Sequence, residues 1–182
     1  NNMPQKLLSK TLALQPKLPT VPPANPIVLE NLREQGILIM PVAQNTNTIY
    51  VNASYMGKDF DDNKIVLLEP IADQLLWLNL ARTGITDKGI ATLEKYKLIT
   101  RLHLENTSIS DAATVHLSML SNLEYLNLYA TQVSDVSVQH LQKLEQLKKI
   151  FLWQTKITPQ GAEALKRHFV DSREYDSLVT QK

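Results

Sequence analysis

A block of 24 residues repeats four times without an insertion, and this period constrains the fold more than any other feature of the sequence. The copies begin at Leu75, Ile99, Leu123 and Leu147. Each copy carries two aliphatic residues separated by one residue, then a threonine, an isoleucine or valine, and a closing leucine. A fixed period of this length is typical of solenoid proteins, in which each unit buries its apolar face against its neighbours.

The first half of each copy has the pattern of a β-strand. In Leu78-Asn79-Leu80 and its equivalents, inward aliphatic residues alternate with outward residues, and strands repeated at a constant spacing predict a parallel sheet. The threonine column follows the strand at the turn: Thr83, Thr107, Thr131 and Thr155. We expect these hydroxyls to satisfy backbone groups of the loops in neighbouring repeats.

The second half of each copy has the pattern of a helix. Thr86, Ser110, Ser134 and Thr158 stand at the expected N-cap position. An acidic residue at the next position favours the helix dipole, and Pro159 suits the same position in the last copy. The acidic residues are Asp87, Asp111 and Asp135. Gly89 and Gly161 lie further along the helix. They indicate either close packing of the helix against its neighbour or positions where glycine has no particular role.

The sequence divides into four parts around these copies. We predict a proline-rich linker at 1–25, an atypical N-terminal capping unit at 26–74, four repeats at 75–170 and a C-terminal tail at 171–182. Within the capping unit we expect a helix from Pro26 to Gln35, a buried strand over Ile37–Met40 and a second strand over 49–53. The capping unit also contains one partial match to the repeat. The spacing of Ile85, Asp87, Ile90 and Leu93 in the first repeat recurs 25 residues earlier at Phe60, Asp62, Ile65 and Leu68.

The repeat pattern resembles a known family. Residues Leu75 to Asp87 read L-x-x-L-x-L-x-x-T-x-I-T-D, which is similar to bacterial leucine-rich repeats of the ribonuclease-inhibitor-like kind. The resemblance covers residues 75–165 and implies an α/β leucine-rich-repeat solenoid, with a parallel concave sheet, convex helices and an irregular N-terminal cap.

A second resemblance concerns the region ahead of the repeats. The segment NPIVLENLREQGILIMPVAQNTN looks like the C-terminal region of bacterial membrane-anchored proteins that carry an upstream c-type cytochrome-like domain. This implies a periplasmic location, for which the sequence itself carries no signal. The motif C-x-x-C-H is absent, so no haem-binding residue is carried over. The alternative function is thus a non-catalytic accessory domain of a periplasmic, membrane-anchored redox protein.

The outward strand positions form the predicted binding surface. There are three such positions in each repeat, from Trp77, Asn79 and Ala81 in the first to Lys149, Phe151 and Trp153 in the last. Five of the chain's eleven aromatic residues fall on these twelve positions, and exposed aromatic side chains are enriched at binding hot spots. The strand preference of aromatic residues, or packing of the tail or an upstream domain, would also account for them. The predicted partner-binding residues are Trp77, Asn79, Arg101, His103, Glu105, Tyr125, Asn127, Tyr129, Phe151 and Trp153.

Composition narrows the function classes. The chain has no cysteine, which excludes disulfides and thiolate metal sites, and a net charge of +1 gives no argument for nucleic-acid binding. No apolar run approaches the ~18 residues that span a bilayer, so we expect no membrane insertion by this segment. We predict a protein or peptide as the partner.

We predict no catalytic activity, cofactor or metal. His103 lies between Arg101 and Glu105 on one strand face, but no serine, cysteine or second carboxylate lies in the adjacent rows. His116 and His140 share a helix position without a third ligand. No glycine-rich phosphate loop or other catalytic motif is present.

Overall fold

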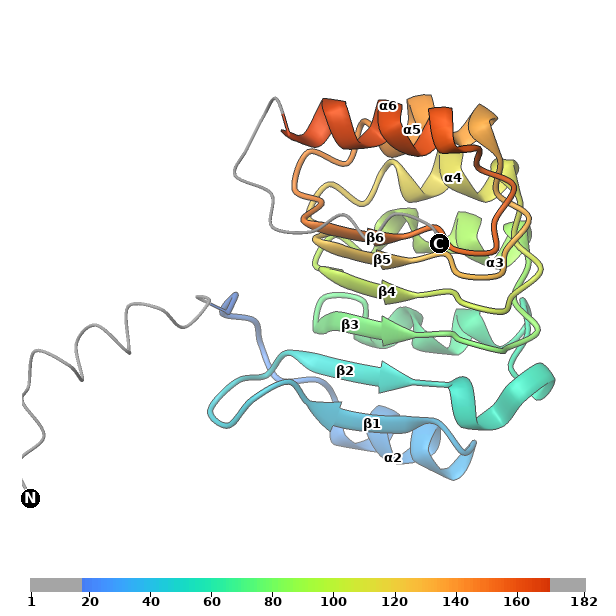
Figure 1. Cartoon of the computed structure of the whole chain (residues 1–182). Helices are drawn as coiled ribbons and strands as arrows, with labels where there is room; N and C mark the ends of the chain where they lie inside the picture. The colour runs from blue at the N-terminus through green and yellow to red at the C-terminus, as the bar shows by residue number, and fades with distance from the viewer. Residues whose placement is uncertain (1–17, 171–182) are drawn as a thin grey trace, which may run out of the picture.

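The computed structural model describes residues 18–170. Helices α3 to α6 lie on one side of the sheet (Figure 1). The predicted tail and residues 1–17 of the predicted linker lie outside the described residues. The elements, with 3-10 helices written η, are α2 (Pro26–Glu34), β1 (Leu38–Pro41), β2 (Ile49–Asn52), η1 (Ser54–Asp59), η2 (Ile65–Ile71), β3 (Leu75–Asn79), α3 (Asp87–Ala91), η3 (Thr92–Lys95), β4 (Arg101–His103), α4 (Asp111–Leu117), β5 (Tyr125–Asn127), η4 (Asp135–Ser137), α5 (Val138–Leu141), β6 (Lys149–Phe151) and α6 (Pro159–Val170).

One six-stranded sheet connects the N-terminal unit with the repeats, in the order β1-β2-β3-β4-β5-β6. Strands β2 to β6 run parallel. Trp77 lies opposite Arg101, which lies opposite Tyr125, so the 24-residue sequence period is also the register of the sheet. The chain is therefore a mixed α/β protein, and the parallel arrangement predicted for the repeat strands is confirmed.

The N-terminal unit follows the predicted order of helix, strand and strand. Asn25 caps α2 by accepting a hydrogen bond from the Ile27 backbone N–H at 2.9 Å, and the chain turns at Gly36 with φ 85°. β1 is only half buried, in contrast to the prediction, because Ile39 faces the core while Leu38 and Met40 are 38% and 41% exposed. β1 pairs antiparallel with β2, since the short connection 42–48 permits a hairpin and no crossover.

The inward columns of the repeats form a continuous core that begins in the N-terminal unit and ends in α6. Leu78, Leu102 and Leu126 are fully buried at the centre of their strands. Phe60, which belongs to the partial repeat match in the N-terminal unit, is equally buried. The burial of these side chains is the main favourable contribution to folding, at about 1.5–3 kcal/mol for each large aliphatic group.

The threonine column is satisfied within its own repeat. The Thr83 hydroxyl donates to the carbonyl oxygen of Leu80, three residues earlier, at 2.6 Å. The prediction that these hydroxyls bond loops of neighbouring repeats was wrong. The chain reverses tightly after the strand, so the nearest acceptor is the carbonyl oxygen three residues earlier in the same repeat. The same bond recurs from Thr107 to Leu104, Thr131 to Leu128 and Thr155 to Leu152.

An aspartate ladder joins the repeats on the helix side. The Asp87 carboxylate accepts two hydrogen bonds from Ser110 of the next repeat, from the backbone N–H at 2.7 Å and from the hydroxyl at 2.6 Å. The aspartate therefore binds the N-cap residue of the following helix in addition to starting its own. The same pair of bonds joins Asp62 to Thr86, Asp111 to Ser134 and Asp135 to Thr158.

The two glycines of the helix column lie against this ladder. A Cβ atom at Gly89 would collide with the Asp62 carboxylate, and one at Gly161 with the Asp135 carboxylate. The equivalent position holds Ser137 in the third repeat, where the hydroxyl donates to Asp111. Gly89 and Gly161 therefore allow close packing against these carboxylates, and the alternative that glycine has no structural role at these positions is wrong.

Candidate functional site

The outward face of the sheet is arranged in three columns set by the parallel register. The first column runs across the start of the strands and the second across their last residues, each with its members on neighbouring strands. The third column follows the strands, where backbone bonds such as Asn106 N–H to the Tyr129 carbonyl at 2.9 Å continue the pairing. The columns are Trp77, Arg101, Tyr125 and Lys149; Asn79, His103, Asn127 and Phe151; and Ala81, Glu105, Tyr129 and Trp153.

Aromatic rings make contact along this face. Tyr125 lies between His103 and Phe151, with ring centroids 4.9 Å and 5.4 Å away, and these contacts run diagonally between neighbouring strands. Tyr129 and Trp153 form a second pair at 5.6 Å. Such ring pairs stabilise by about 0.5–1.5 kcal/mol beyond the area they bury. We call Tyr50, Trp77, Tyr125, Tyr129, Phe151 and Trp153 the aromatic strip.

Tyr50 is a member of this strip that the sequence analysis missed. Its ring meets that of Trp77 edge-on, with centroids 6.2 Å apart. Ile49 and Val51 on either side are buried, so Tyr50 faces outward beside the first repeat. The alternation of Ile49, Val51 and Ala53 in the second predicted strand already indicated that Tyr50 faces the other way. Outward positions were compared only among the four aligned repeats, and Tyr50 lies in the capping unit before them.

The exposure of the face varies along the third column. Trp153 is 51% exposed, whereas Ala81 is 5% exposed. Ala81 was predicted to occupy an outward position, and its small side chain offers almost no accessible surface there. The remaining rings of the strip are half-buried, largely by one another and by the neighbouring side chains. Trp153 therefore presents the largest free aromatic surface of the site.

The two predicted asparagines have a local task. The side-chain oxygen of Asn79 accepts from the Ala81 backbone N–H at 2.9 Å, and that of Asn127 accepts from the Tyr129 N–H at 3.0 Å. Both bonds close the turn after the strand, a common role for asparagine. Their amide oxygens are thus occupied, and only the amide NH₂ groups remain for a partner.

His103 and Glu105 lie together on the same strand face, with His103 Nδ1 3.2 Å from Glu105 Oε1. The second carboxylate oxygen of Glu105 is buried and has no hydrogen-bond partner among residues 18–170. Tyr125 packs against His103. Burial of the phenol, followed by the nearby Glu105 charge, raises the pKa of Tyr125, while Arg101 opposes the shift. The Tyr125 hydroxyl therefore stays protonated at neutral pH and can donate a hydrogen bond.

Two cations lie over rings of the strip. The Arg101 guanidinium lies 4.6 Å from the ring centroid of Trp77, and the Lys149 ammonium lies 5.2 Å from that of Phe151. Both distances fall within the range of cation–π attraction. The contacts hold the long side chains near the sheet while their charges remain available.

The helix side offers no comparable cluster. His116 Nδ1 lies 2.6 Å from the Glu94 carboxylate, whereas His140 Nδ1 is buried without a partner in the part of the chain that the structure describes. Among the described residues no group of three or more histidines and carboxylates could hold a metal ion. The two histidines predicted to share a helix position thus differ in their surroundings.

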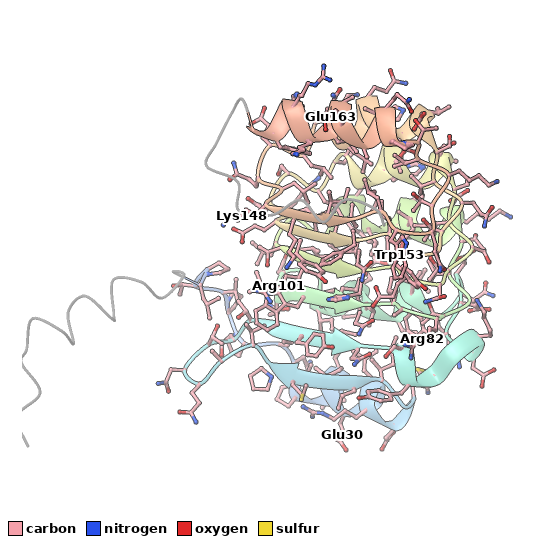
Figure 2. The ribbon with its side chains drawn as sticks, viewed as in Figure 1. Glu30, Arg82, Arg101, Lys148, Trp153 and Glu163 are labelled. Carbon is pink, nitrogen blue, oxygen red and sulfur yellow. The ribbon has the colours of Figure 1, made fainter. Side chains whose placement is uncertain are left out.

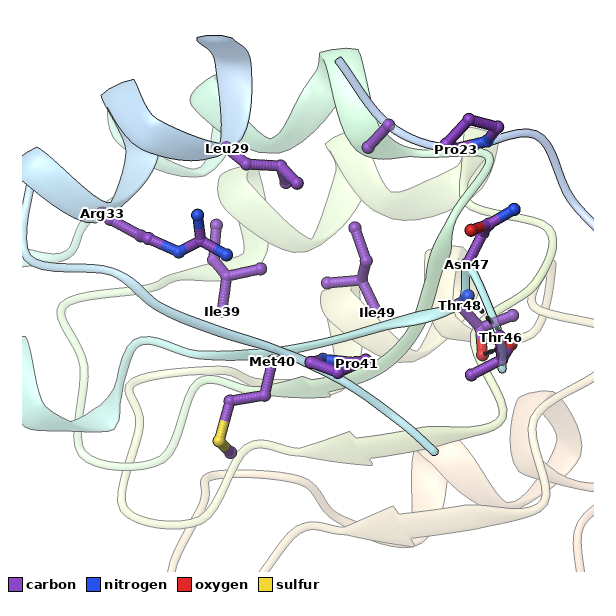
Figure 3. Close-up of a pocket in the computed structure, with 11 residues that line it drawn as sticks. Pro23, Leu29, Arg33, Ile39, Met40, Pro41, Thr46, Asn47, Thr48 and Ile49 are labelled. Atoms are coloured by element: carbon purple, nitrogen blue, oxygen red, sulfur yellow. Dashed lines mark hydrogen bonds between the residues drawn. The ribbon is translucent and has the colours of Figure 1, made fainter. Parts of the chain in front are cut away.

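A cavity of about 180 Å³ lies between α2 and the β1–β2 hairpin. Figure 3 shows Ile39 and Ile49 pointing from the strands toward Leu29 of α2. Its one charged lining residue, Arg33, is 3.5 Å from Glu30 on the same helix. The hairpin contributes Thr46 and Thr48, whose hydroxyls bond each other at 2.8 Å. Among the described residues, the lining has no general base that could activate these hydroxyls.

Comparisons with known proteins find similar chains among solved structures but none by sequence. No family model matches the chain, and no curated protein matches it significantly. A solved internalin from Listeria monocytogenes is similar over 63% of this chain and 32% of its own length, with 24% identity and a TM-score of 0.46. The chain thus spans less than two thirds of that protein.

Within the described residues no helix has both the length and the apolar character required to cross a bilayer. The periplasmic location and the upstream cytochrome-like domain that the sequence resemblance implies stay predictions.

Proposed function

We propose that the chain is a leucine-rich-repeat solenoid that serves as an interaction module, with the outward, concave face of its sheet binding a protein or peptide. The regular 24-residue register supports the solenoid, because each repeat adds one strand and one helical segment to its predecessor. The proposed partner-binding residues are those predicted from the sequence, together with Tyr50.

The observation that carries the proposal is the aromatic strip. Six aromatic side chains from strands β2, β3, β5 and β6 or the turns that follow them lie on one face, and Trp153 is half exposed. Aromatic side chains contribute large contact areas with few rotatable bonds, which makes them frequent hot spots of protein interfaces. Catalysis is not favoured, because His103 has a carboxylate neighbour but no nucleophile beside it.

The experiment uses peptides as probes. A phage-displayed library of random short peptides is selected on the full chain, and the affinity of recovered peptides is measured by fluorescence anisotropy. We expect the variant Tyr129→Ala/Trp153→Ala to bind at least about tenfold more weakly, since loss of hot-spot aromatics commonly has this effect. The readout is the dissociation constant at fixed salt concentration.

The matched control removes apolar surface from the helix side. Met119 and Val136 are 53% and 60% exposed there, so Met119→Ala/Val136→Ala deletes exposed apolar side chains without touching the sheet. We expect its affinity to equal that of the wild type. If Tyr129→Ala/Trp153→Ala keeps its circular dichroism spectrum and binds as tightly as the wild type, the outward face is not the binding surface.

A further inference from the structure

The first outward column places two cations on either side of a tyrosine. Arg101 on β4 and Lys149 on β6 are each in register with Tyr125 on β5. Since neighbouring strands are about 4.8 Å apart, the Cα atoms of the two cationic residues are about 10 Å apart. Long side chains at this separation can both reach one small group above Tyr125.

Neither cation is neutralised by a carboxylate of the described residues. Between residues 18 and 170 no carboxylate lies within ion-pair distance of Arg101 or Lys149, and each lies instead over an aromatic ring. The adjacent Lys148 is different, because its ammonium is 2.8 Å from the Glu124 carboxylate. A cation–π contact restricts the side chain but leaves the charge and its N–H donors available.

A cavity of about 290 Å³ opens at this place, lined by Arg101, Glu124, Tyr125, Lys148 and Lys149. Three cations face one carboxylate there, and that carboxylate already has Lys148 as its partner. Figure 2 shows Arg101 and Lys148 toward the end of the sheet where the strands begin, and Trp153 toward the opposite end.

We propose that this cavity binds a carboxylate of an acidic segment of the protein or peptide partner. Arg101 and Lys149 donate charge-assisted hydrogen bonds to its oxygens, and apolar side chains beside the acidic residue lie on the aromatic strip. This inference rests on the proposed function and adds the chemistry of the partner to it. The attraction is local, because the net charge of the whole chain is only +1.

The charges of the face also orient the segment. Glu105 lies in the third column, beyond the strand ends, and among residues 18–170 its carboxylate has only His103 as a neighbour within hydrogen-bond distance. A partner carboxylate is repelled there and attracted at the strand starts, where Arg101 and Lys149 lie. The acidic residue of the partner therefore lies at the first column, and its neutral or basic residues lie toward Trp153.

The test repeats the peptide selection on three forms of the full chain: the wild type, Arg101→Gln/Lys149→Gln, and the control Lys88→Gln/Lys143→Gln. The control removes two exposed lysines in or beside the helices, with the same loss of charge. Peptides recovered on the wild type and on the control are expected to be enriched in Asp and Glu over the unselected library. Peptides recovered on Arg101→Gln/Lys149→Gln are expected to lose this enrichment and to keep their apolar residues.

A recovered peptide is then compared with its own Asp→Asn and Glu→Gln form. We expect the amide form to bind the wild type about tenfold more weakly, since charge-assisted bonds are stronger than neutral ones, and to bind Arg101→Gln/Lys149→Gln no worse than the acidic form does. Affinity of the acidic form for the wild type should fall as salt rises.

The outcomes separate this inference from the proposed function. Peptides that lack an acidic enrichment but depend on Tyr129 and Trp153 overturn the carboxylate site and leave the binding module standing. An acidic enrichment that the control variant loses equally also overturns the site, because the attraction is then unspecific. Failure of Tyr129→Ala/Trp153→Ala to weaken any recovered peptide overturns the proposed function, and the carboxylate site with it.

Discussion

Tyr96 is the largest fully buried side chain of the described residues, and its hydroxyl has no hydrogen-bond partner there. It lies just after η3, in the turn that leads to β4. Burial, and secondarily the negative charge of Glu69, raises the pKa of this phenol above its ordinary value. The ring fills the core, while the hydroxyl contributes an unsatisfied polar atom, which is unfavourable in an apolar environment.

We therefore expect Tyr96→Phe to stabilise the fold by about 1 kcal/mol, since it removes an unpaired buried hydroxyl and retains the ring. The raised pKa contributes stability that is present below the unfolded-state pKa of about 10 and is lost as pH rises above it. The variant should lose less stability than the wild type between neutral and strongly alkaline pH. Urea unfolding across this range measures both effects, and a destabilised variant with the same alkaline dependence would contradict them.

Backbone strain recurs at one residue in each repeat. Arg82, Asn106, Ala130 and Gln154 adopt positive φ of 54–60°, three residues after the end of each strand. Asparagine tolerates this left-handed conformation, whereas the other three are held in it by the surrounding turn. A local preference alone would not produce the turn at Ala130, so the packing of neighbouring repeats determines it.

At the scale of elements, the aspartate ladder connects each helix to the preceding one. Asp111 is its most strongly bonded member, because Ser137 donates to it in addition to Ser134. Burial alone would raise the pKa of Asp111, but the hydrogen bonds from Ser134 and Ser137, with help from Lys156, hold it below its usual value. Asp135 makes only the two bonds to Thr158 and is more exposed.

We expect Asp111→Ala to destabilise the protein by about 2–3 kcal/mol and Asp135→Ala by about 1 kcal/mol, as measured by urea unfolding at pH 7. Because the folded-state pKa of Asp111 is lowered, its contribution is present above the unfolded-state pKa and declines as pH falls below about 4. The difference between wild type and Asp111→Ala should therefore narrow in acid. Equal losses for the two variants at pH 7 would show that the third donor contributes nothing.

At the scale of the whole molecule, one core extends through every repeat. Trp77 lies on β3 in the first repeat and Trp153 lies after β6 in the last, so the two tryptophans report on opposite ends of the stack. A chain whose units bury their faces only against neighbours unfolds cooperatively when the interfaces are strong relative to the units. The continuity of the core, from the N-terminal unit to α6, favours one transition.

We expect the variants Trp153→Phe and Trp77→Phe, each with one remaining tryptophan, to unfold in urea at the same midpoint by fluorescence and by circular dichroism. Leu126→Ala in either background should lower the stability by about 3 kcal/mol and shift both reporters together, because it opens a cavity in the middle of the core. If Trp153 responds at a lower urea concentration than the dichroism signal, the last repeat unfolds independently.

The sequence alone determined the strands, the helix starts and the register of the repeats. The period of 24 residues sets the register, and the alternation Leu78-Asn79-Leu80 sets which side chains face inward, so both follow from spacing along the chain. It also identified most of the outward aromatic residues. Tyr50 was not identified because β2 belongs to no aligned copy. The burial of Ala81 was not predicted, because alternation gives the direction of a side chain and not its exposure.

The tertiary structure alone decided which side chains meet. That Asp87 bonds the cap of the next helix, that Asn79 closes its own turn, and that Arg101 lies over Trp77 all depend on the placement of segments relative to one another. A pattern along the chain gives the direction of a side chain but not the position of its neighbours. The proposed carboxylate site beside Tyr125 could be inferred only from the structure for this reason, because its two cations, Arg101 and Lys149, come from different repeats.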